Sequence, residues 1–306
     1  ASATVSLALG GLAVVATFAA VVRALRTQDP FLDVRLFRSR AFSAAGLVSL
    51  LTGYAFATAI IGGAVFVDRV LYGGPDEQRL ALGALAGATA VGALVSGFAV
   101  RVLSLRIVTL VGLLLSAATL WLMAGWTPSV DIGTVAAVLG LFGLGFGLTV
   151  TPRSTAAVES AGRASFGMAS AIVTVARMIG MAVGVAILTA YGSTTIDLLY
   201  DQLFSAANPE GWRSVLPPEL RERPLQDGLV VNALEAWAAG EASTILVGMF
   251  LAAAIVTIIA IPPGLALERA RRLTPERAAA GLGPPGARGG TDGPDGGDEL
   301  EPTIAV

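Results

Sequence analysis

Arg177 is the one charged side chain inside the long apolar stretches of this sequence, and it lies in the stretch from about 164 to 191. Counting from Ser165, a helix rising about 1.5 Å per residue would place Arg177 roughly 18 Å deep in a membrane. A charge there costs at least about 2.5 to 3.5 kcal/mol, so it should face protein or a wet cavity. Backbone carbonyls, a substrate anion or another part of the protein could balance it. A role in a transport path or in coupling and a polar contact that holds helices together are both open interpretations.

The residue types that are absent exclude most catalytic chemistry. All 20 basic residues are Arg, and the chain has no Lys, His or Cys. A Lys Schiff base, a His base, a Cys nucleophile, a disulfide and a Cys/His zinc site are therefore impossible. A phosphate-binding loop needs Lys, so any pumping must use an ion gradient or a partner. We expect no enzyme, no catalytic residue, no metal and no cofactor.

Aromatic and hydroxyl side chains at helical spacing could line a path for an amphipathic substrate. Phe142, Phe146 and Thr149 share one helix face at i, i+4, i+7 spacing, and Tyr54 and Thr58 are spaced i, i+4. Phe that faces lipid is the alternative explanation for the aromatic residues. We predict a role in the substrate path or in coupling for these five residues.

Three pairs of glycines predict close helix packing, because G-x-x-x-G lets two helix backbones approach each other in lipid. The pairs are Gly83 with Gly87, Gly143 with Gly147, and Gly180 with Gly184. Pro152 is expected to end the helix that carries the second pair.

Transmembrane helices are the elements that must position these residues. The chain is 55% hydrophobic and only 14% charged, against about 25% charged in a typical soluble domain. A helix needs about 20 mostly apolar residues to cross the bilayer. The qualifying stretches are 1–22, 41–67, 80–100, 107–126, 132–151, 164–191 and 242–267. We predict an all-α polytopic membrane protein with seven transmembrane helices.

The placement of Arg in short loops predicts the orientation. The basic connector 23–40 and the later segments 101–106, 153–163 and 269–277 carry Arg on one side, whereas the short loops of the other side carry only Arg69 and Arg79. The C-terminus is therefore expected in the cytoplasm, in the plasma (inner) membrane of a bacterium. A first span that starts outside without a leader suggests the C-terminal portion of a longer protein.

Two segments are expected outside the membrane. Residues 192–241 form an acidic extracytoplasmic loop, whose second half is expected to be an amphipathic helix because apolar residues recur there at i, i+4 spacing. Residues 268–306 form a cytoplasmic tail, expected to be disordered from about 281 because it is rich in Gly and Pro. The net charge of −2 and the scattered Arg predict no nucleic-acid partner.

Several motifs resemble those of the 14-span drug:proton antiporters (multidrug efflux) of the major facilitator superfamily. Residues 169–188, with Arg177, are similar to that family's penultimate helix, 29–42 to its connector into the ninth helix, and 143–160 to its twelfth helix and the loop beyond. The resemblance makes 1–22 a linker helix and the next six spans, 41–191 and 242–267, a C-terminal half-bundle of two triplets. The loop 97–106 departs from the family's pattern, because it lacks an acidic residue and a second glycine.

The resemblance implies a secondary active transporter that works by alternating access and exports small, amphipathic or drug-like molecules in exchange for protons. Its partners would be the small-molecule substrate, protons, the lipid bilayer and a missing N-terminal bundle that holds the proton-carrying carboxylates. The alternative is a non-transporting membrane scaffold or assembly subunit that uses the acidic loop 192–241 as its interaction surface.

Overall fold

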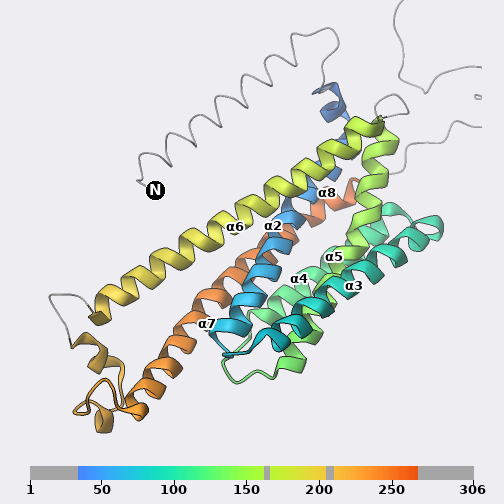
Figure 1. Ribbon diagram of the computed structural model, residues 1–306. Coiled ribbons are helices and arrows are strands. Elements are labelled where there is room, and N and C mark those ends of the chain that lie inside the picture. The colour runs from blue at the N-terminus through green and yellow to red at the C-terminus, as the bar shows by residue number, and fades with distance from the viewer. Residues whose placement is uncertain (1–33, 162–165, 205–209, 268–306) are drawn as a thin grey trace, which may run out of the picture. The chain divides into compact units, whose positions relative to one another are not determined.

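The computed structural model describes residues 34–161, 166–204 and 210–267, and every regular element in these ranges is a helix (Figure 1). The elements are η1 (Val34–Arg38), α2 (Arg40–Arg69), α3 (Pro75–Val102), α4 (Leu105–Met123), α5 (Ile132–Ala161), α6 (Phe166–Phe204), η3 (Gly211–Val215), η4 (Pro218–Leu220), α7 (Gly228–Ile259) and α8 (Ile261–Leu265).

Six stretches of the described helices are long and apolar enough to cross a membrane. They lie in α2, α3, α4, α5, α6 and α7 with α8, and they match the last six of the expected spans. This confirms the prediction of an all-helical polytopic membrane protein. The expected span 1–22, most of the connector 23–40 and the expected tail 268–306 lie outside the described residues.

Local sequence signals start several of these helices. The Ser39 hydroxyl accepts the Phe42 N–H at 3.5 Å before α2, and the Ser104 hydroxyl accepts the Ile107 N–H at 3.3 Å before α4. Both serines satisfy a backbone donor that the first turn leaves without a partner. Pro75 begins α3, where a helix needs no N–H from that residue.

The prediction that Pro152 ends its helix is wrong, because α5 continues to Ala161 with Pro152 inside it. Proline removes one backbone hydrogen bond, and an isolated helix would usually kink or stop there. In a membrane protein, neighbouring helices can compensate. Pro152 is buried, and the adjacent Thr151 hydroxyl accepts a hydrogen bond from Ser96 of α3 at 2.7 Å. The continued helix carries the next residue, Arg153, out of the expected loop and into the bundle.

The connection between the last two long helices is also shorter than the expected loop 192–241. α6 extends to Phe204 and α7 already begins at Gly228. The 39 residues of α6 correspond to about 58 Å, well beyond the roughly 30 Å of a bilayer core. The sequence allows this extension because no Pro occurs between 152 and 209. The helix expected in the second half of the loop is present as the first turns of α7.

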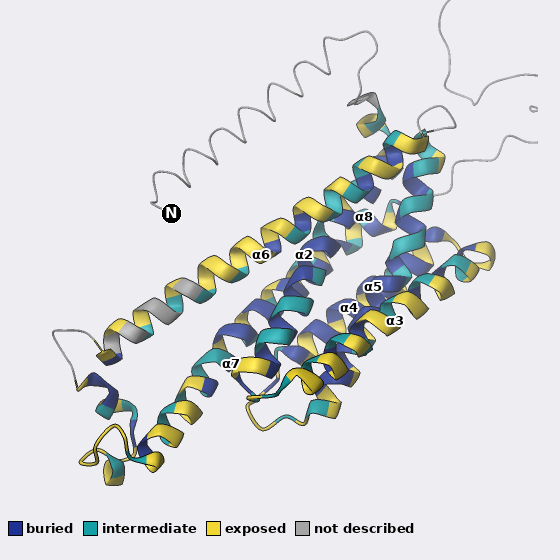
Figure 2. Ribbon diagram, viewed as in Figure 1, coloured by how far each residue is buried: buried dark blue, intermediate teal, exposed yellow. Residues whose placement is uncertain are grey.

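Two central helices, α2 and α5, organise the bundle. α3 packs along α5 and α6 packs along α2, while α4 contacts α5 and α7 contacts α2. In the apolar windows of these helices, 61% of α2 and 56% of α5 are buried, against 22% of α3 and 17% of α6 (Figure 2). The helix that follows α2 in the chain thus packs on α5, and the helix that follows α5 packs on α2.

Aromatic residues fill the core between these helices. Phe66, Phe142 and Phe250 are fully buried within one apolar cluster from α2, α5 and α7. The Trp126 ring lies 4.9 Å from the Phe66 ring and 5.4 Å from the Phe250 ring. This core holds α2 and α5 together beside the buried arginine described next.

Candidate functional site

Arg153 is the largest fully buried side chain among the described residues, with 2% of its surface exposed. Its Nη1 donates a hydrogen bond to the Thr52 hydroxyl of α2. Its guanidinium carbon lies 5.0 Å from the centroid of the Phe146 ring, in cation–π geometry. The Thr52 hydroxyl in turn donates to the Val48 carbonyl at 2.7 Å. The structure therefore places a cation between α2 and α5, where the sequence predicted a cytoplasmic loop residue.

The described residues satisfy Arg153 only in part. Its Nη2 has no hydrogen-bond partner among them, and none of their carboxylates forms an ion pair with it. Burying an unpaired charge is costly, so buried guanidinium groups are normally paired with anions or strong acceptors. Nη2 is a donor that an anion or a carbonyl oxygen could satisfy, although it is buried in this structure.

Arg177 approaches the same place from α6. Its backbone packs against Gly53, the neighbour of Thr52, so closely that a Cβ on Gly53 would collide with the Arg177 carbonyl. Its side chain is partly exposed. Like Arg153, it has no ion pair with a described carboxylate. Two neighbouring positive charges repel each other, which increases the advantage of an anion between or beside them.

The two arginines lie at similar depth in the bundle. Arg153 precedes the end of α5 by about 12 Å of helix, and Arg177 follows the start of α6 by about 17 Å. Only residues 162–165 separate these two helix ends. Both arginines therefore lie nearer to the bundle end at which α5 ends and α6 begins.

The predicted aromatic residues Phe142 and Phe146 face α2. Both are buried, and their rings stack with Phe56 at centroid distances of 6.5 and 4.2 Å. Thr149 is also buried, and its hydroxyl donates to the Phe146 carbonyl at 2.7 Å. Their position rules out the lipid-facing explanation in this structure, and a part in a substrate path stays a prediction.

Tyr54 and Thr58 lie further along α2 and are both buried. The Thr58 hydroxyl donates to the Tyr54 carbonyl at 3.1 Å, a bond within the helix. Neither residue is hydrogen-bonded to Arg153. The structure thus brings Phe146, Arg177 and the unpredicted Arg153 together, and it leaves Tyr54 and Thr58 to one side.

Two of the three glycine pairs lie at helix contacts. At each of these positions a Cβ would meet the backbone of the partner helix at 2.9 Å or less. The partners are Leu85 for Gly143, Thr89 for Gly147, Leu50 for Gly180, and Tyr54 for Gly184. In contrast, a methyl group added at Gly83 or Gly87 would have no described atom within 4 Å, so this pair contacts no described helix.

Arg153 is the candidate residue that the sequence reasoning missed. The rule that proline stops a helix assigned it to a loop. The signal that could have found it is the run Thr155–Val158, which follows Arg153 without a charge or a glycine and allows the helix to continue.

No family model matches the chain. Its relatives include mycobacterial proteins named triacylglyceride transporters. One from Mycolicibacterium smegmatis is 31% identical over 302 residues, or 94% of this chain and 51% of the relative. One from Mycolicibacterium hassiacum is 37% identical over 190 residues (59% and 36%), and one from Mycobacterium tuberculosis is 31% identical over 218 residues (66% and 41%). The chain spans about half the length, or less, of these curated relatives. Their names support a membrane transporter and do not favour a non-transporting scaffold.

Proposed function

We propose that this chain is the C-terminal portion of a secondary active transporter that moves a lipidic or amphipathic molecule across a bacterial membrane by alternating access. The observation that carries the proposal is the buried, incompletely paired guanidinium of Arg153 beside Arg177. A side chain that only held helices together would use its donors within the bundle. Arg153 instead keeps Nη2 unpaired among the described residues, as expected of a site that awaits an anion.

The packing order of the six long helices supports the proposal that they form one half of a major facilitator fold. α2, α3 and α4 form one triplet, and α5, α6 and α7 form the other. The second helix of each triplet packs on the first helix of the other triplet, α3 on α5 and α6 on α2. An exchange of this kind is what a three-plus-three inverted repeat produces. The proposed motion is a rocking of this bundle against an N-terminal bundle formed by the rest of the transporter.

The way in which proton movement is coupled to transport depends on which side chains can gain or lose a proton. A guanidinium keeps its proton at any physiological pH, so Arg153 and Arg177 supply fixed positive charge. This chain has no Lys and no His, so any of its own side chains that carries a proton near neutral pH must be a carboxylate. We propose that a helix movement exposes Nη2 of Arg153, which is buried in this structure, and that a carboxylate of the N-terminal bundle then pairs with it. Protonation of that carboxylate would release the pair. The release would bias the two bundles toward a different relative orientation.

The names of the relatives support an acylglycerol as the substrate, in place of the drug-like molecules implied by the resemblance. A molecule of that kind carries no charge, so its own groups would not neutralise Arg153. A carboxylate partner for Arg153 therefore fits a lipid substrate better than a substrate anion does. The cytoplasmic position of the C-terminus, derived from the distribution of Arg, is part of the same proposal.

Proton flux measured on the full-length protein tests this function. The protein is reconstituted into vesicles with an internal pH-sensitive dye, and triacylglycerol or amphipathic drugs are added in turn. The proposal expects proton movement that depends on triacylglycerol and stops when the pH gradient is dissipated. Correctly inserted protein that moves no protons when triacylglycerol is added would rule the function out.

A further inference from the structure

An apolar cavity of about 640 Å³ lies between α2, α6 and α7, at the end of the bundle where α6 and α7 are joined. Small-molecule sites usually have volumes of about 300 to 1,000 Å³. Leu188 and Leu199 of α6 and Leu246 and Met249 of α7 are among its lining residues. Two charged residues, Arg69 and Glu241, also line it. We call it the α6–α7 cavity.

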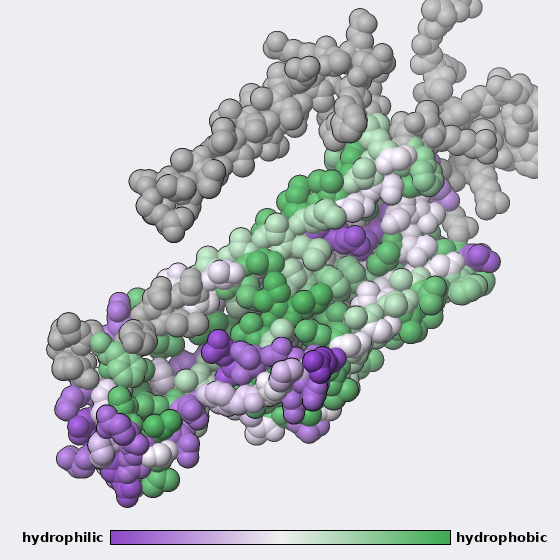
Figure 3. Space-filling model, in the orientation of Figure 1, coloured by the Kyte–Doolittle hydropathy of each residue, from purple (hydrophilic) through white to green (hydrophobic). Residues whose placement is uncertain are grey.

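A second, smaller cavity of about 310 Å³ continues the first. The two share five lining residues, which are Tyr72, Leu203, Phe204, Trp237 and Ala238. Between Leu188 and Leu203 the lining follows about 22 Å of α6. Figure 3 shows hydrophobic residues over the middle of this face and hydrophilic residues gathered at the α6–α7 end. The cavities therefore extend an apolar surface toward the polar end of the bundle.

Two contacts connect the elements that surround the cavities. The Tyr72 hydroxyl donates to the Glu235 carbonyl at 2.8 Å and so ties the end of α2 to α7. Tyr72 has a φ of 50°, in the left-handed region that bulky residues avoid, so its position is held by its surroundings. Leu203, which lines both cavities, also belongs with Trp212 and Val230 to a small core that joins the ends of α6 and α7.

We infer that the two cavities together bind one acyl chain of a glycerolipid. The inference rests on the proposed function, and it adds a site that lies apart from Arg153. A long, mostly apolar lining suits a hydrocarbon chain, because each buried methylene is stabilised while no polar group of the chain needs a partner. Arg69 pairs with Asp68 through Nε at 2.9 Å, which leaves its terminal nitrogens for the ester carbonyls of the lipid.

Ala238 offers a direct test, because it lines both cavities and is exposed. Ala238→Trp would fill the region that the two cavities share, without overpacking the core. Ala236 is also exposed, lies on the opposite face of the same helix and lines neither cavity. Ala236→Trp is therefore the matched control.

The full-length protein is reconstituted with a triacylglycerol that carries a photoreactive group on one acyl chain, and cross-linked peptides are identified after irradiation. We expect labelling of 188–204 and 237–249. Ala238→Trp should lower it by about ten-fold, whereas Ala236→Trp should leave it unchanged. Equal labelling of the two variants, or labelling only outside these ranges, would overturn the inference.

A second measurement does not depend on a bulky substitution. In a background without cysteine, Leu199→Cys reports from the cavity lining, and Leu198→Cys reports from an exposed neighbour that lines neither cavity. Triacylglycerol should slow maleimide labelling of the first position only, and equal protection of both or of neither contradicts the site.

If Ala238→Trp loses labelling and the unmodified protein still shows no proton flux, the proposed function fails and the site stands. If flux persists in every variant while labelling is absent, the site fails and the function stands.

Discussion

The guanidinium of Arg153 and the backbone of Arg177 contact consecutive residues of α2. Arg153 donates to the hydroxyl of Thr52, and Arg177 packs on Gly53. The arginines come from different helices, α5 and α6, so α2 is the element that sets their relative position. Any movement of α2 against α5 or α6 would change the spacing of the two charges, and this would couple helix motion to the anion binding that we propose.

Thr52 should stabilise the bundle through its hydroxyl. Thr52→Val keeps the shape of the side chain but removes the acceptor for Arg153, so we expect a loss of about 1 to 3 kcal/mol in the free energy of unfolding. Thr52→Ser keeps an acceptor and should lose less. Thermal unfolding of both variants in detergent makes the comparison, and equal losses would show that the hydrogen bond is unimportant.

Arg177→Ala in the full-length protein should abolish export while membrane insertion stays intact. The reason is that the variant removes one of two neighbouring cations but leaves the backbone contact with Gly53 in place. Export from vesicles and the amount of inserted protein are measured together. Unchanged export in vesicles would show that Arg177 has no part in the site.

Gly180→Ala should destabilise the contact between α2 and α6. A methyl group at Gly180 would collide with the Leu50 carbonyl, a backbone atom that cannot move aside alone. We expect a cost of about 1 to 3 kcal/mol, typical of overpacking. Gly83→Ala is the control, because no described atom lies within 4 Å of the added methyl. A cost at Gly83 equal to that at Gly180 would contradict the assignment of the contact.

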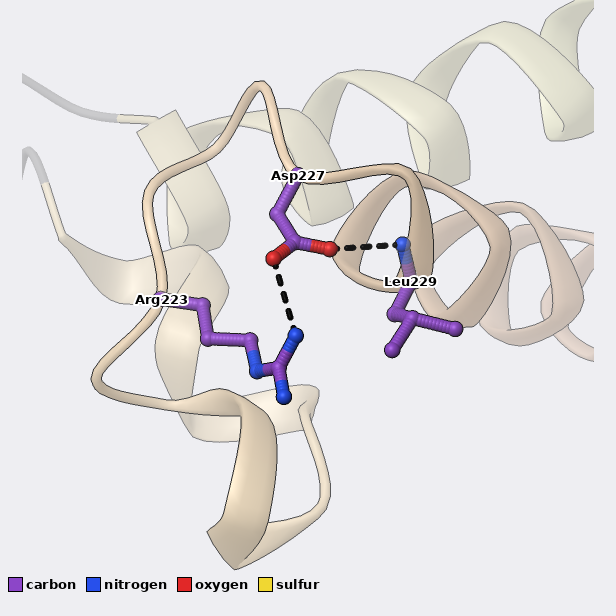
Figure 4. A network of polar contacts seen from close by, with 3 residues as sticks. All are labelled: Arg223, Asp227 and Leu229. Carbon is purple, nitrogen blue, oxygen red and sulfur yellow. Dashed lines mark hydrogen bonds and ion pairs between the residues drawn. The ribbon is translucent and has the colours of Figure 1, made fainter.

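The start of α7 should respond to acid through Asp227 (Figure 4). Its carboxylate accepts the Leu229 N–H at 2.9 Å and pairs with Arg223 at 3.0 Å. The backbone hydrogen bond first, and Arg223 second, hold the pKa of Asp227 below its usual 3.8. A folded-state pKa below the unfolded one means that the stabilisation is complete above that unfolded value and is lost as the pH falls through the lower, folded pKa.

The protection factors of the first amides of α7, which correct for the intrinsic pH dependence of exchange, should therefore be constant from about pH 5 to 8 and fall below about pH 3. Asp227→Asn keeps a capping oxygen but cannot titrate, so its protection should not depend on pH in the acid range. The same acid response in both proteins would assign the effect to another group.

The membrane helices could be predicted from the sequence because a span is encoded in apolar length alone. The last six expected spans are present for this reason, and Arg177 was visible as the one charge among them. The helix ends were harder to predict. α6 continues to Phe204 because no proline stops it, and hydropathy alone does not show how far a helix continues past the bilayer.

Arg153 could not be predicted because its burial depends on tertiary packing. A Pro–Arg pair after an apolar stretch is usually a helix end in a basic loop. Arg153 points into the bundle because its guanidinium contacts Thr52 of α2 and the ring of Phe146, which lies two turns earlier in α5. The same limit applies to the glycine pairs. Gly83 and Gly180 have equivalent sequence patterns, yet only Gly180 has a described partner.

The central claim is that the buried charge of Arg153 couples ion movement to transport. Export of a labelled triacylglycerol by the full-length protein, driven by an imposed proton gradient in vesicles, tests it most directly. Arg153→Gln keeps hydrogen-bonding capacity but removes the charge, and it should lower the export rate by about 100-fold or more, the size of effect that losing a desolvated ion pair of about 3 kcal/mol gives. Arg79→Gln is the control, because Arg79 is exposed and pairs only with Asp76 among the described residues. Arg153→Gln protein that inserts and exports lipid at the rate of the unmodified protein would contradict the claim.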